Sequence, residues 1–359
     1  MPAPFRLIDT GLRSGRMNIS LDQAMIDARA AGEIGDTLRF IEFEPCVLVG
    51  RHQAVSQEVQ LDYCRANGIE VGRRITGGGT IFMDPGVLGW ALVCDKRALG
   101  TTSLAEITQK VCEAAARGLS MLGFPAKFRP RNDIEVEGRK LCGTGGFFDG
   151  DTMIYQSTIL GRLDPQVMLS ALNVPQAKLA KRGLDDASKR VVTLEELLGG
   201  PPDWAKVKEC LATAFAEDLG IDFTPDTLSE TETTRAGELF ATEIGTDEFV
   251  YDIDDPARDA SVHSGQIITP GGTVSAYVRV EGAASRTIRE VLFSGDFFVA
   301  PPRIVMDLEA SLRGIRVEDV PKAVSAFFED AGAAGLLSIQ PAAFTDAVLA
   351  AVGELEGAP

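Results

Sequence analysis

The run "RRITGGGTIF", residues 73–82, constrains the fold of this chain more than any other stretch. Three consecutive glycines give up side-chain packing and cost backbone entropy on folding, so a specific local geometry must offset that cost. The segments "IEVGRRI" before the glycines and "GTIFM" after them both alternate as strands do. The run therefore predicts a tight turn of bare backbone between two strands, with two arginines beside it.

Bare backbone beside arginines favours anion binding. Exposed N–H groups in a glycine turn form a concave cradle for a phosphate, and the missing side chains let a narrow ligand approach. Arg73 and Arg74 add fixed charge and fork-shaped donors. The Gly-Lys-Ser/Thr ending of a Walker A loop is missing. A plain β-turn with two surface arginines accounts for the glycines equally well, so the turn alone leaves both interpretations open.

A second group of polar residues lies in "RNDIEVEGRKLCGTGG", residues 131–146. The pattern predicts a β-hairpin that turns at Glu137-Gly138, with Lys140 on its second arm. A lysine there could place its ammonium against a phosphate and a carboxylate together. Asp133 or Asn132 could hold Mg²⁺ through one or two oxygens, as that ion prefers. Taken alone, the motif fits a solvated hairpin lysine with a turn-forming Asn-Asp pair better.

Cys142 is a candidate nucleophile, because strand alternation puts it on the same face as Lys140, whose charge would favour the thiolate. No histidine lies nearby in sequence to act as its base. The chain has only His52 and His263, which also disfavours a histidine metal site or a Ser-His-Asp triad. Without a nearby base, Cys142 is expected to be a small packed residue. The six cysteines form no CxxC pair, which predicts a reducing cytoplasm.

The charge is unevenly distributed along the chain. Residues 221–359 carry 9 basic and 24 acidic side chains, so −15 of the net charge of −17 lies there. The balance disfavours general nucleic-acid binding, while residues 1–220 can still form a positive pocket for an anionic ligand. No apolar run approaches the ~20 residues of a membrane span, and the first residues lack the pattern of a secretory signal. We expect no nucleic-acid or membrane partner.

The order of elements predicts two domains. Strand patterns alternate with helices, the strongest over residues 104–122, and a breaker cluster "GGPPD" precedes another helix. Residues 221–248 are typical of surface or connection, and from residue 249 the pattern changes to short strands and two final helices. We predict an α+β fold with mixed β-sheets flanked by helices over residues 1–245, and a small α+β accessory domain over residues 246–359.

Three stretches in this order, "RRITGGGTIFMDPG", "RNDIEVEGRKLCG" and "STILGRLDPQVMLSALN" continued by "KRVVTLEELLG", make the chain resemble the lipoate-protein ligase family, within the biotin- and lipoate-ligase catalytic fold. The resemblance covers about residues 5–200, and residues 249–345, with "VLFSGDFF", resemble the accessory domain of the larger ligases. It implies an ATP-dependent enzyme that activates lipoate to lipoyl-AMP and transfers it to a lysine amine. The implied acceptor is a lipoyl domain, a glycine-cleavage H-type protein or a lipoate-binding carrier.

The resemblance also implies roles for individual residues. Lys140 matches the catalytic lysine that bridges the lipoate carbonyl and the phosphate, and Asp133 matches the Mg²⁺ position. ATP and Mg²⁺ are the implied cofactors, with lipoate as substrate. The residues implied to bind the nucleotide are Arg73, Arg74, Gly77, Gly78, Gly79, Thr80, Ile81, Phe82, Asn132, Lys140 and Arg190.

The chain departs from the family pattern at several positions. Met83 stands where the family usually has a histidine, and "YQST" at residues 155–158 replaces the usual His-His-Gly-Thr. Lys189 precedes Arg190 where the family usually has serine. These changes leave the choice between lipoate and octanoate open, together with the acceptor protein and the oligomeric state.

Two other functions remain open. The first is an octanoyl- or lipoyl-transferase that works through a cysteine thioester without ATP. In such relatives the nucleophile lies in a Pro-Cys-Phe setting upstream of the lysine, whereas "PAKFRPRND" here has no cysteine, so Cys142 is the only nearby candidate. The second is a non-catalytic lipoate binder, which Met83 and Gln156 keep open. A biotin ligase is disfavoured, because its Gly-Arg-Gly-Arg-x-Gly-Arg stretch is absent.

Overall fold

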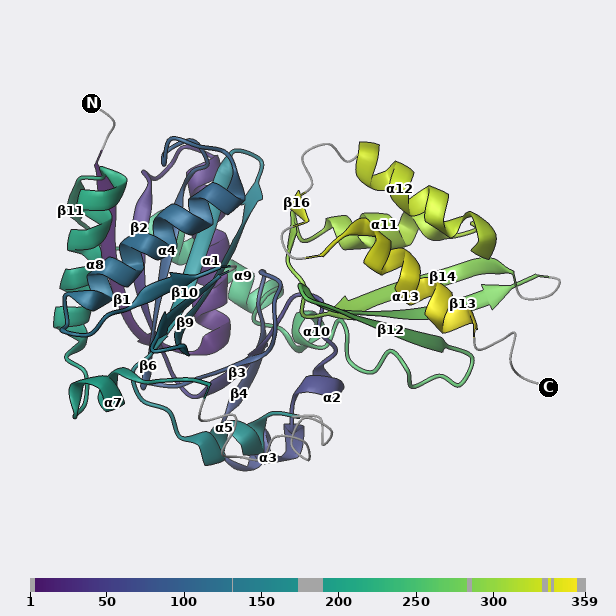
Figure 1. The fold of residues 1–359 in the computed structure, drawn as a ribbon, viewed down its shortest axis with the longest axis horizontal. Coiled ribbons are helices and arrows are strands. Elements are labelled where there is room, and N and C mark those ends of the chain that lie inside the picture. The colour runs from purple at the N-terminus through teal and green to yellow at the C-terminus, as the bar shows by residue number, and fades with distance from the viewer. Residues whose placement is uncertain are drawn as a thin grey trace. The chain divides into compact units, whose positions relative to one another are not determined.

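The computed structural model describes residues 4–130, 132–173, 190–282, 286–330, 335–336 and 339–353 (Figure 1). The chain divides into two compact units. The N-terminal unit comprises residues 1–48, 59–73 and 81–249, and the C-terminal unit comprises residues 49–58, 74–80 and 250–359. The domain division at residues 245/246 stays a prediction, and the compact units differ from it by grouping two short early segments with the C-terminal residues.

An eight-stranded mixed sheet forms the centre of the N-terminal unit. Its strand order is β11-β1-β2-β6-β10-β9-β8-β7. β1 pairs in parallel with β2 and β11, and the neighbours from β2 through β7 pair antiparallel. The strands are β1 (Phe5–Arg13), β2 (Thr37–Phe43), β6 (Val87–Asp95), β7 (Lys127–Arg129), β8 (Asp133–Val136), β9 (Arg139–Asp149), β10 (Thr152–Leu160) and β11 (Phe223–Pro225). The predicted mixed α+β architecture is confirmed.

Helices α4 (Leu104–Ser120) and α8 (Trp204–Leu219) pack together and cover one face of this sheet. Ser103 begins α4 as its N-cap and accepts a hydrogen bond from the N–H of Glu106, which satisfies a donor that the first turn leaves unpaired. The apolar positions of α4, spaced by three and four residues, are buried against the strands, as the sequence pattern predicts. This layer is the largest hydrophobic core of the described residues, and Trp90 at its centre is fully buried.

Smaller elements complete the N-terminal unit. A second sheet has the order β4-β3-β5, with strands β3 (Cys46–Val49), β4 (Glu70–Arg73) and β5 (Ile81–Met83). The other helices are α1 (Gly15–Ala30), α3 (Leu61–Ala66), α5 (Pro165–Ala171), α7 (Leu194–Leu198) and α9 (Glu230–Thr242), and α10 (Asp247–Val250) follows at the chain boundary of the two units. The strands on either side of the glycine run, β4 and β5, both flank β3.

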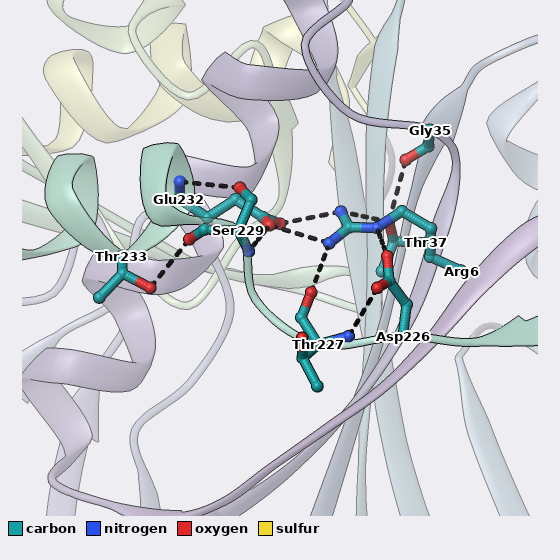
Figure 2. Close-up of polar contacts among 8 residues, drawn as sticks. All are labelled: Arg6, Gly35, Thr37, Asp226, Thr227, Ser229, Glu232 and Thr233. Carbon is teal, nitrogen blue, oxygen red and sulfur yellow. Dashed lines mark hydrogen bonds and ion pairs between the residues drawn. The ribbon is translucent and has the colours of Figure 1, made fainter.

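Arg6 adds side-chain contacts between the main sheet and the segment of residues 221–248, whose strand β11 already pairs with β1. Arg6 of β1 pairs with Asp226 at 2.7 Å and with Glu232 at 2.9 Å, and it also donates to Thr227 O (Figure 2). Glu232 is buried and forms a capping box with Ser229 at the start of α9. α9 itself buries Glu232 and Ala236, and Ala236 packs in a small apolar cluster with Leu21 and Ala24 of α1. The Arg6 ion pairs and this packing together hold a segment of surface composition against the rest of the N-terminal unit.

The C-terminal unit contains a three-stranded antiparallel sheet covered by helices. The strands are β12 (His263–Thr269), β13 (Gly272–Glu281) and β14 (Thr287–Gly295), and a small pair is formed by β15 (Val299–Ala300) and β16 (Gly335–Leu336). The helices are α2 (Val55–Glu58), α11 (Ile304–Leu312), α12 (Val320–Asp330) and α13 (Pro341–Gly353), with a 3₁₀ turn at Val317–Asp319. Its own hydrophobic core lies between the sheet and α11, α12 and α13.

No helix among the described residues is both long enough and apolar enough to cross a membrane.

Candidate functional site

The hairpin of β8 and β9 carries the first group of predicted residues. Its two-residue turn has Glu137 at φ 52° and Gly138 at φ 79°, the left-handed pair that a tight hairpin needs. The predicted turn is therefore confirmed. Asp133 pairs with Gly143 across the hairpin, and Arg129 of β7 pairs with Asp133 on the other side.

A β-bulge determines which side chains of β9 face outward. Glu135 pairs with Lys140 and Ile134 pairs with Cys142, so Leu141 is an extra residue in β9. Leu141 and Cys142 are both buried in the main core, whereas the Lys140 side chain is 39% exposed. The prediction that Lys140 and Cys142 share a face is wrong, because a bulge breaks the simple alternation of side chains along a strand.

Lys140 lies in an ion-pair network on the outer face of the hairpin. Its Nζ is 2.8 Å from Asp133 Oδ1, and the Arg129 guanidinium pairs with both Asp133 and Glu135. The hydrogen bond to Asp133 raises the pKa of Arg129 above its ordinary value. A Cβ at Gly143 would lie 2.9 Å from Lys140 Nζ, so the glycine makes room for the lysine to lie along the strand. Within this network the Lys140 side chain stays 39% exposed.

The backbone of Lys140 is held on its second edge by the segment that contains Arg190. Lys140 N donates to Arg190 O at 2.8 Å, and Val192 N donates to Lys140 O at 2.9 Å. The Arg190 side chain is exposed. The structure therefore brings together the predicted residues Lys140, Asp133 and Arg190, while Arg131 and Lys189 lie outside the described residues.

Asn132 is held by three hydrogen bonds to Thr144 of β9. Asn132 O accepts from Thr144 N and from Thr144 Oγ1, both at 2.9 Å, and Asn132 Nδ2 donates to Thr144 O at 2.6 Å. These three bonds fix the corner where the chain enters β8. Asn132 and Asp133 thus begin the arm of the hairpin that faces Lys140.

Among the described residues, Asp133 is not part of a cluster of side chains that could hold a metal ion without other ligands. Within the described parts of the chain, no three histidine, cysteine or acidic side chains come close enough to hold a metal ion. Asp133 contributes a single carboxylate, which already accepts from two cations. A single carboxylate suits a cation that arrives bound to substrate phosphates.

The glycine turn belongs to the C-terminal unit, where two of its glycines pack against the segment "SGDFF". A Cβ at Gly77 would lie 2.4 Å from Phe297 O, and a Cβ at Gly78 would lie 2.4 Å from the Phe298 ring. Gly78 N also donates to Phe297 O at 3.1 Å, and its φ of 91° is left-handed. At Gly79 the nearest atom is Asp296 Cβ at 3.8 Å. The bare backbone of Gly77 and Gly78 is thus used for protein packing.

Arg73 and Arg74 are both buried. Arg74 Nη2 donates to Gly77 O at 3.0 Å and to Gly79 O at 2.9 Å, so it braces the turn from within. Burial lowers the pKa of Arg74 to about 10, which leaves it charged at neutral pH. Arg73, in the N-terminal unit, donates to Phe249 O at 3.2 Å. The interpretation as a plain turn with two surface arginines is wrong, since neither arginine is on the surface.

The residues after the glycines have separate environments. Thr80 Oγ1 donates to Gln53 Oε1 at 2.8 Å within the C-terminal unit. Ile81 and Phe82 belong to β5 in the N-terminal unit, where Phe82 is buried and pairs with Val47. Met83, which replaces the histidine of the family pattern, is 1% exposed. Its side chain is therefore part of the core.

Gln156, the second departure from the family pattern, contacts a buried ion pair. Its Nε2 donates to Asp22 Oδ2 at 2.6 Å, while Arg39 Nη1 donates to Asp22 Oδ1 at 2.7 Å. Arg39 also donates to Asn18 Oδ1 at 2.6 Å. Burial raises the pKa of Asp22 against the opposing effect of Arg39. The network ties β2 and β10 to α1.

The predicted nucleotide-binding residues and the predicted metal residue Asp133 are divided between the two units. The N-terminal unit holds Arg73, Ile81, Phe82, Asn132, Asp133, Lys140 and Arg190, and the C-terminal unit holds Arg74, Gly77, Gly78, Gly79 and Thr80. Sequence reasoning missed Arg129 and Thr144, which contact Asp133 and Asn132. Arg129 lies three positions before Asn132 in "FRPRND". No local pattern signals its role, because the register of β7 on β8 decides it.

Comparison with known proteins identifies relatives of this arrangement. The sequence profile of the lipoyl protein ligase A/B catalytic domain matches residues 14–216. The octanoyltransferase LipM of Symbiobacterium thermophilum is 29% identical over 272 residues, which cover 69% of this chain and 98% of that protein.

Two solved structures are also similar. One is the bi-partite lipoate protein ligase of Thermoplasma acidophilum, solved in a study of that ligase and its E2 lipoyl domain. It is 26% identical, with a TM-score of 0.63 over 70% of this chain and 97% of that chain. The other is a lipoate-protein ligase A bound with ATP, which is 25% identical with a TM-score of 0.60 over 70% of this chain and all of that chain.

Proposed function

This chain belongs to the family of the lipoyl protein ligase A/B catalytic domain, and within that family we propose that it is an ATP-dependent lipoate-protein ligase. Family members among its relatives include lipoate ligases and octanoyltransferases. The two activities differ in how the acyl group is activated. A ligase joins it to AMP, whereas the thioester route requires a cysteine nucleophile.

The observation that carries the proposal is the burial of every cysteine. The chain has six cysteines, and all six are buried thiols. Cys142, the candidate nearest to Lys140 in sequence, is 1% exposed, and burial raises its pKa well above the ordinary value. A cysteine nucleophile needs an accessible site that favours the thiolate. Activation by ATP requires no protein nucleophile, so it agrees with this arrangement.

The proposed reaction has two steps. A lipoate carboxylate oxygen attacks the α-phosphorus of ATP, which forms lipoyl-AMP and releases pyrophosphate. The ε-amine of an acceptor lysine then attacks the acyl carbon, which forms the amide and releases AMP. The first step brings two anions together, and the Lys140 ammonium supplies positive charge where it is needed. Asp133 keeps that ammonium oriented at 2.8 Å. The relative bound with ATP supports a nucleotide substrate.

We propose a lipoyl domain as the acceptor. The support is the Thermoplasma ligase, which was studied together with its E2 lipoyl domain and shares 26% of its residues with this chain. A glycine-cleavage H-type protein and a lipoate-binding carrier remain the other acceptors to test. Mg²⁺ enters this proposal as part of the ATP substrate, beside Asp133.

The second candidate is octanoyl transfer through a thioester, which the similarity to the octanoyltransferase LipM favours. The two functions predict opposite dependence on ATP and on Cys142. A lipoate binder without catalysis is the third candidate, and it predicts binding without turnover.

The test is lipoate-dependent exchange of labelled pyrophosphate into ATP by the full chain. We expect exchange in the wild type, a loss of at least about 100-fold in Lys140→Ala, and little change in Cys142→Ala. Lys140→Arg, which keeps the charge, is the matched variant for the lysine. Acyl transfer from an acyl-carrier thioester without ATP, abolished by Cys142→Ala, would instead establish the transferase. Lipoate binding without exchange or transfer would establish the binder.

A further inference from the structure

A chain of buried polar groups lies directly beneath the Asn132 corner. Tyr155 of β10 and Thr144 of β9 both face the main core, where they are 1% and 5% exposed. Their hydroxyl oxygens are 2.7 Å apart, and Cys112 Sγ of α4 lies 3.4 Å from each. A buried hydroxyl without a partner costs free energy, so a polar chain that is fully bonded inside a core specifies one arrangement.

The donors and acceptors of these groups determine the direction of the hydrogen bonds between them. A hydroxyl has one proton to donate. Thr144 Oγ1 uses that proton on Asn132 O at 2.9 Å, so the contact between the two hydroxyls must be donated by Tyr155. The chain therefore runs from the Tyr155 O–H to Thr144 and from the Thr144 O–H to the Asn132 carbonyl. Burial raises the pKa of Tyr155 well above its ordinary value, so the phenol remains a donor at neutral pH.

This series of hydrogen bonds ends at Asn132, which is next to Asp133, a residue on which the proposed function depends. Thr144 makes three hydrogen bonds to Asn132. Its own side chain is buried on the core side of the hairpin. The next residue, Asp133, pairs with Lys140. A shift of the corner would therefore move the carboxylate that orients the lysine.

We propose that Thr144 and Tyr155 are positioning residues that fix the Asn132–Asp133 corner, and through it the Lys140 ion pair, for the nucleotide phosphates. The inference rests on the proposed function for its ligand, but its geometric part applies to the free protein. Neither side chain touches the outer face, so both act through Asn132. A small displacement of such a positioning element changes reaction rates strongly, because binding and orientation depend on short distances.

The experiment compares three variants of the full chain. Thr144→Val removes the hydroxyl at nearly constant volume, Tyr155→Phe removes the donor behind it, and Thr144→Ser restores the hydroxyl. We expect Thr144→Val to raise the KM for ATP in the exchange reaction about tenfold, with the KM for lipoate nearly unchanged, and Tyr155→Phe to raise it about threefold. Thr144→Ser should resemble the wild type within about twofold.

Ser157→Ala is the matched control. Ser157 pairs with Thr144 across the two strands and is 4% exposed, and within the described residues its Oγ has no hydrogen-bond partner. The change removes a buried hydroxyl from the same layer without breaking a bond. We expect it to leave both KM values unchanged. If Thr144→Val and Ser157→Ala raised the KM for ATP equally, a general disturbance of the core would explain the change and the proposal would be wrong.

A second readout separates this inference from the proposed function. The Lys140 amine is labelled with trinitrobenzenesulfonate in the free protein, and the rate is followed by peptide mapping. A loosened corner should raise the labelling rate about threefold in Thr144→Val but not in Thr144→Ser or Ser157→Ala. If the wild type showed no ATP exchange, the ligase function would be refuted. The labelling rates would still test whether Thr144 fixes the Asn132–Asp133 corner. Labelling and KM values unchanged in Thr144→Val would overturn the inference.

Discussion

The hairpin of residues 133–149 and the glycine turn of residues 74–80 both combine basic side chains with glycines, but the glycines do different work. In the hairpin, Gly143 makes room for the side chain of Lys140, which stays 39% exposed. In the turn, Gly77 and Gly78 make room for Phe297 and Phe298. The same residue types therefore leave Lys140 partly exposed and Arg74 buried.

The two cations differ correspondingly in their partners. Lys140 pairs with the carboxylate of Asp133, whereas Arg74 donates to the carbonyls of Gly77 and Gly79. An exposed ion pair contributes little to stability, while a buried donor removed from its carbonyls leaves them unsatisfied. The comparison indicates that the hairpin lysine is available for chemistry and that the turn arginine stabilises the fold.

The largest stability effect is expected from Gly78→Ala. The new methyl group would overlap the Phe298 ring at 2.4 Å, and φ at this position is 91°. Overpacking and a left-handed alanine together should lower the free energy of unfolding of the C-terminal unit by about 3 to 4 kcal/mol. Amide hydrogen exchange resolved by peptide measures the two units separately.

Gly79→Ala is the matched control for this prediction. The nearest atom to its new methyl group would be 3.8 Å away, which is ordinary contact. We expect a change of less than about 1 kcal/mol. Equal destabilisation by the two substitutions would show that the glycines are needed for backbone conformation and not to make space for the Phe298 ring.

A comparison of Arg74→Ala with Lys140→Ala tests the difference between the two cations. Removal of Arg74 leaves the carbonyls of Gly77 and Gly79 without its guanidinium, and we expect a loss of about 2 to 3 kcal/mol. Removal of the partly exposed Lys140 should cost less than about 1 kcal/mol. The free energies come from urea denaturation followed by hydrogen exchange. A larger loss from Lys140→Ala would reverse the assignment of the structural cation.

The smallest effect expected is a difference in pH dependence between two glutamates, the partly buried Glu309 and the fully buried Glu232. Desolvation raises the pKa of Glu309 in the C-terminal unit to about 7, and the hydrogen bond from the Phe293 N–H to Glu309 Oε1 at 2.7 Å offsets only part of that rise. Burial alone would also raise the pKa of Glu232, but hydrogen bonds from Arg6 and Ser229 bring it below the ordinary value. The two carboxyl groups should therefore give opposite slopes of stability against pH.

The signs follow from proton binding. Folded Glu309 binds its proton more tightly than the unfolded chain, so its stabilisation is complete below the unfolded pKa and is lost as pH rises through about 7. Glu309→Gln should flatten this decline by about 1 to 2 kcal/mol between pH 5 and 7. Folded Glu232 has a lowered pKa, so its contribution to the free energy of unfolding is complete above the unfolded pKa and is lost as pH falls below it. Hydrogen exchange between pH 5 and 7 checks the Glu309 slope, and exchange below the unfolded glutamate pKa of 4.5 checks the Glu232 slope. An unchanged slope between pH 5 and 7 in Glu309→Gln would contradict the prediction.

Several parts of the structure could be predicted from the sequence because they depend on near neighbours. The turn at Glu137-Gly138, the helix that begins at Leu104 and the mixed α+β class all follow from local backbone preferences and periodicity. The order of the glycine run, the Asn-Asp pair and the lysine was sufficient to indicate the family that the profile match establishes.

The tertiary structure decided how those motifs are used. The bulge at Leu141 separates Cys142 from Lys140, and a residue far along the chain, Phe298, occupies the space above Gly78. Arg129 and Thr144 contact the site through strand register. Sequence determines which backbone conformations are favourable nearby, whereas burial and pairing depend on residues brought close only when the chain folds. For this reason the sequence determined the fold class and the candidate residues, and the fold decided which side chains are free for chemistry.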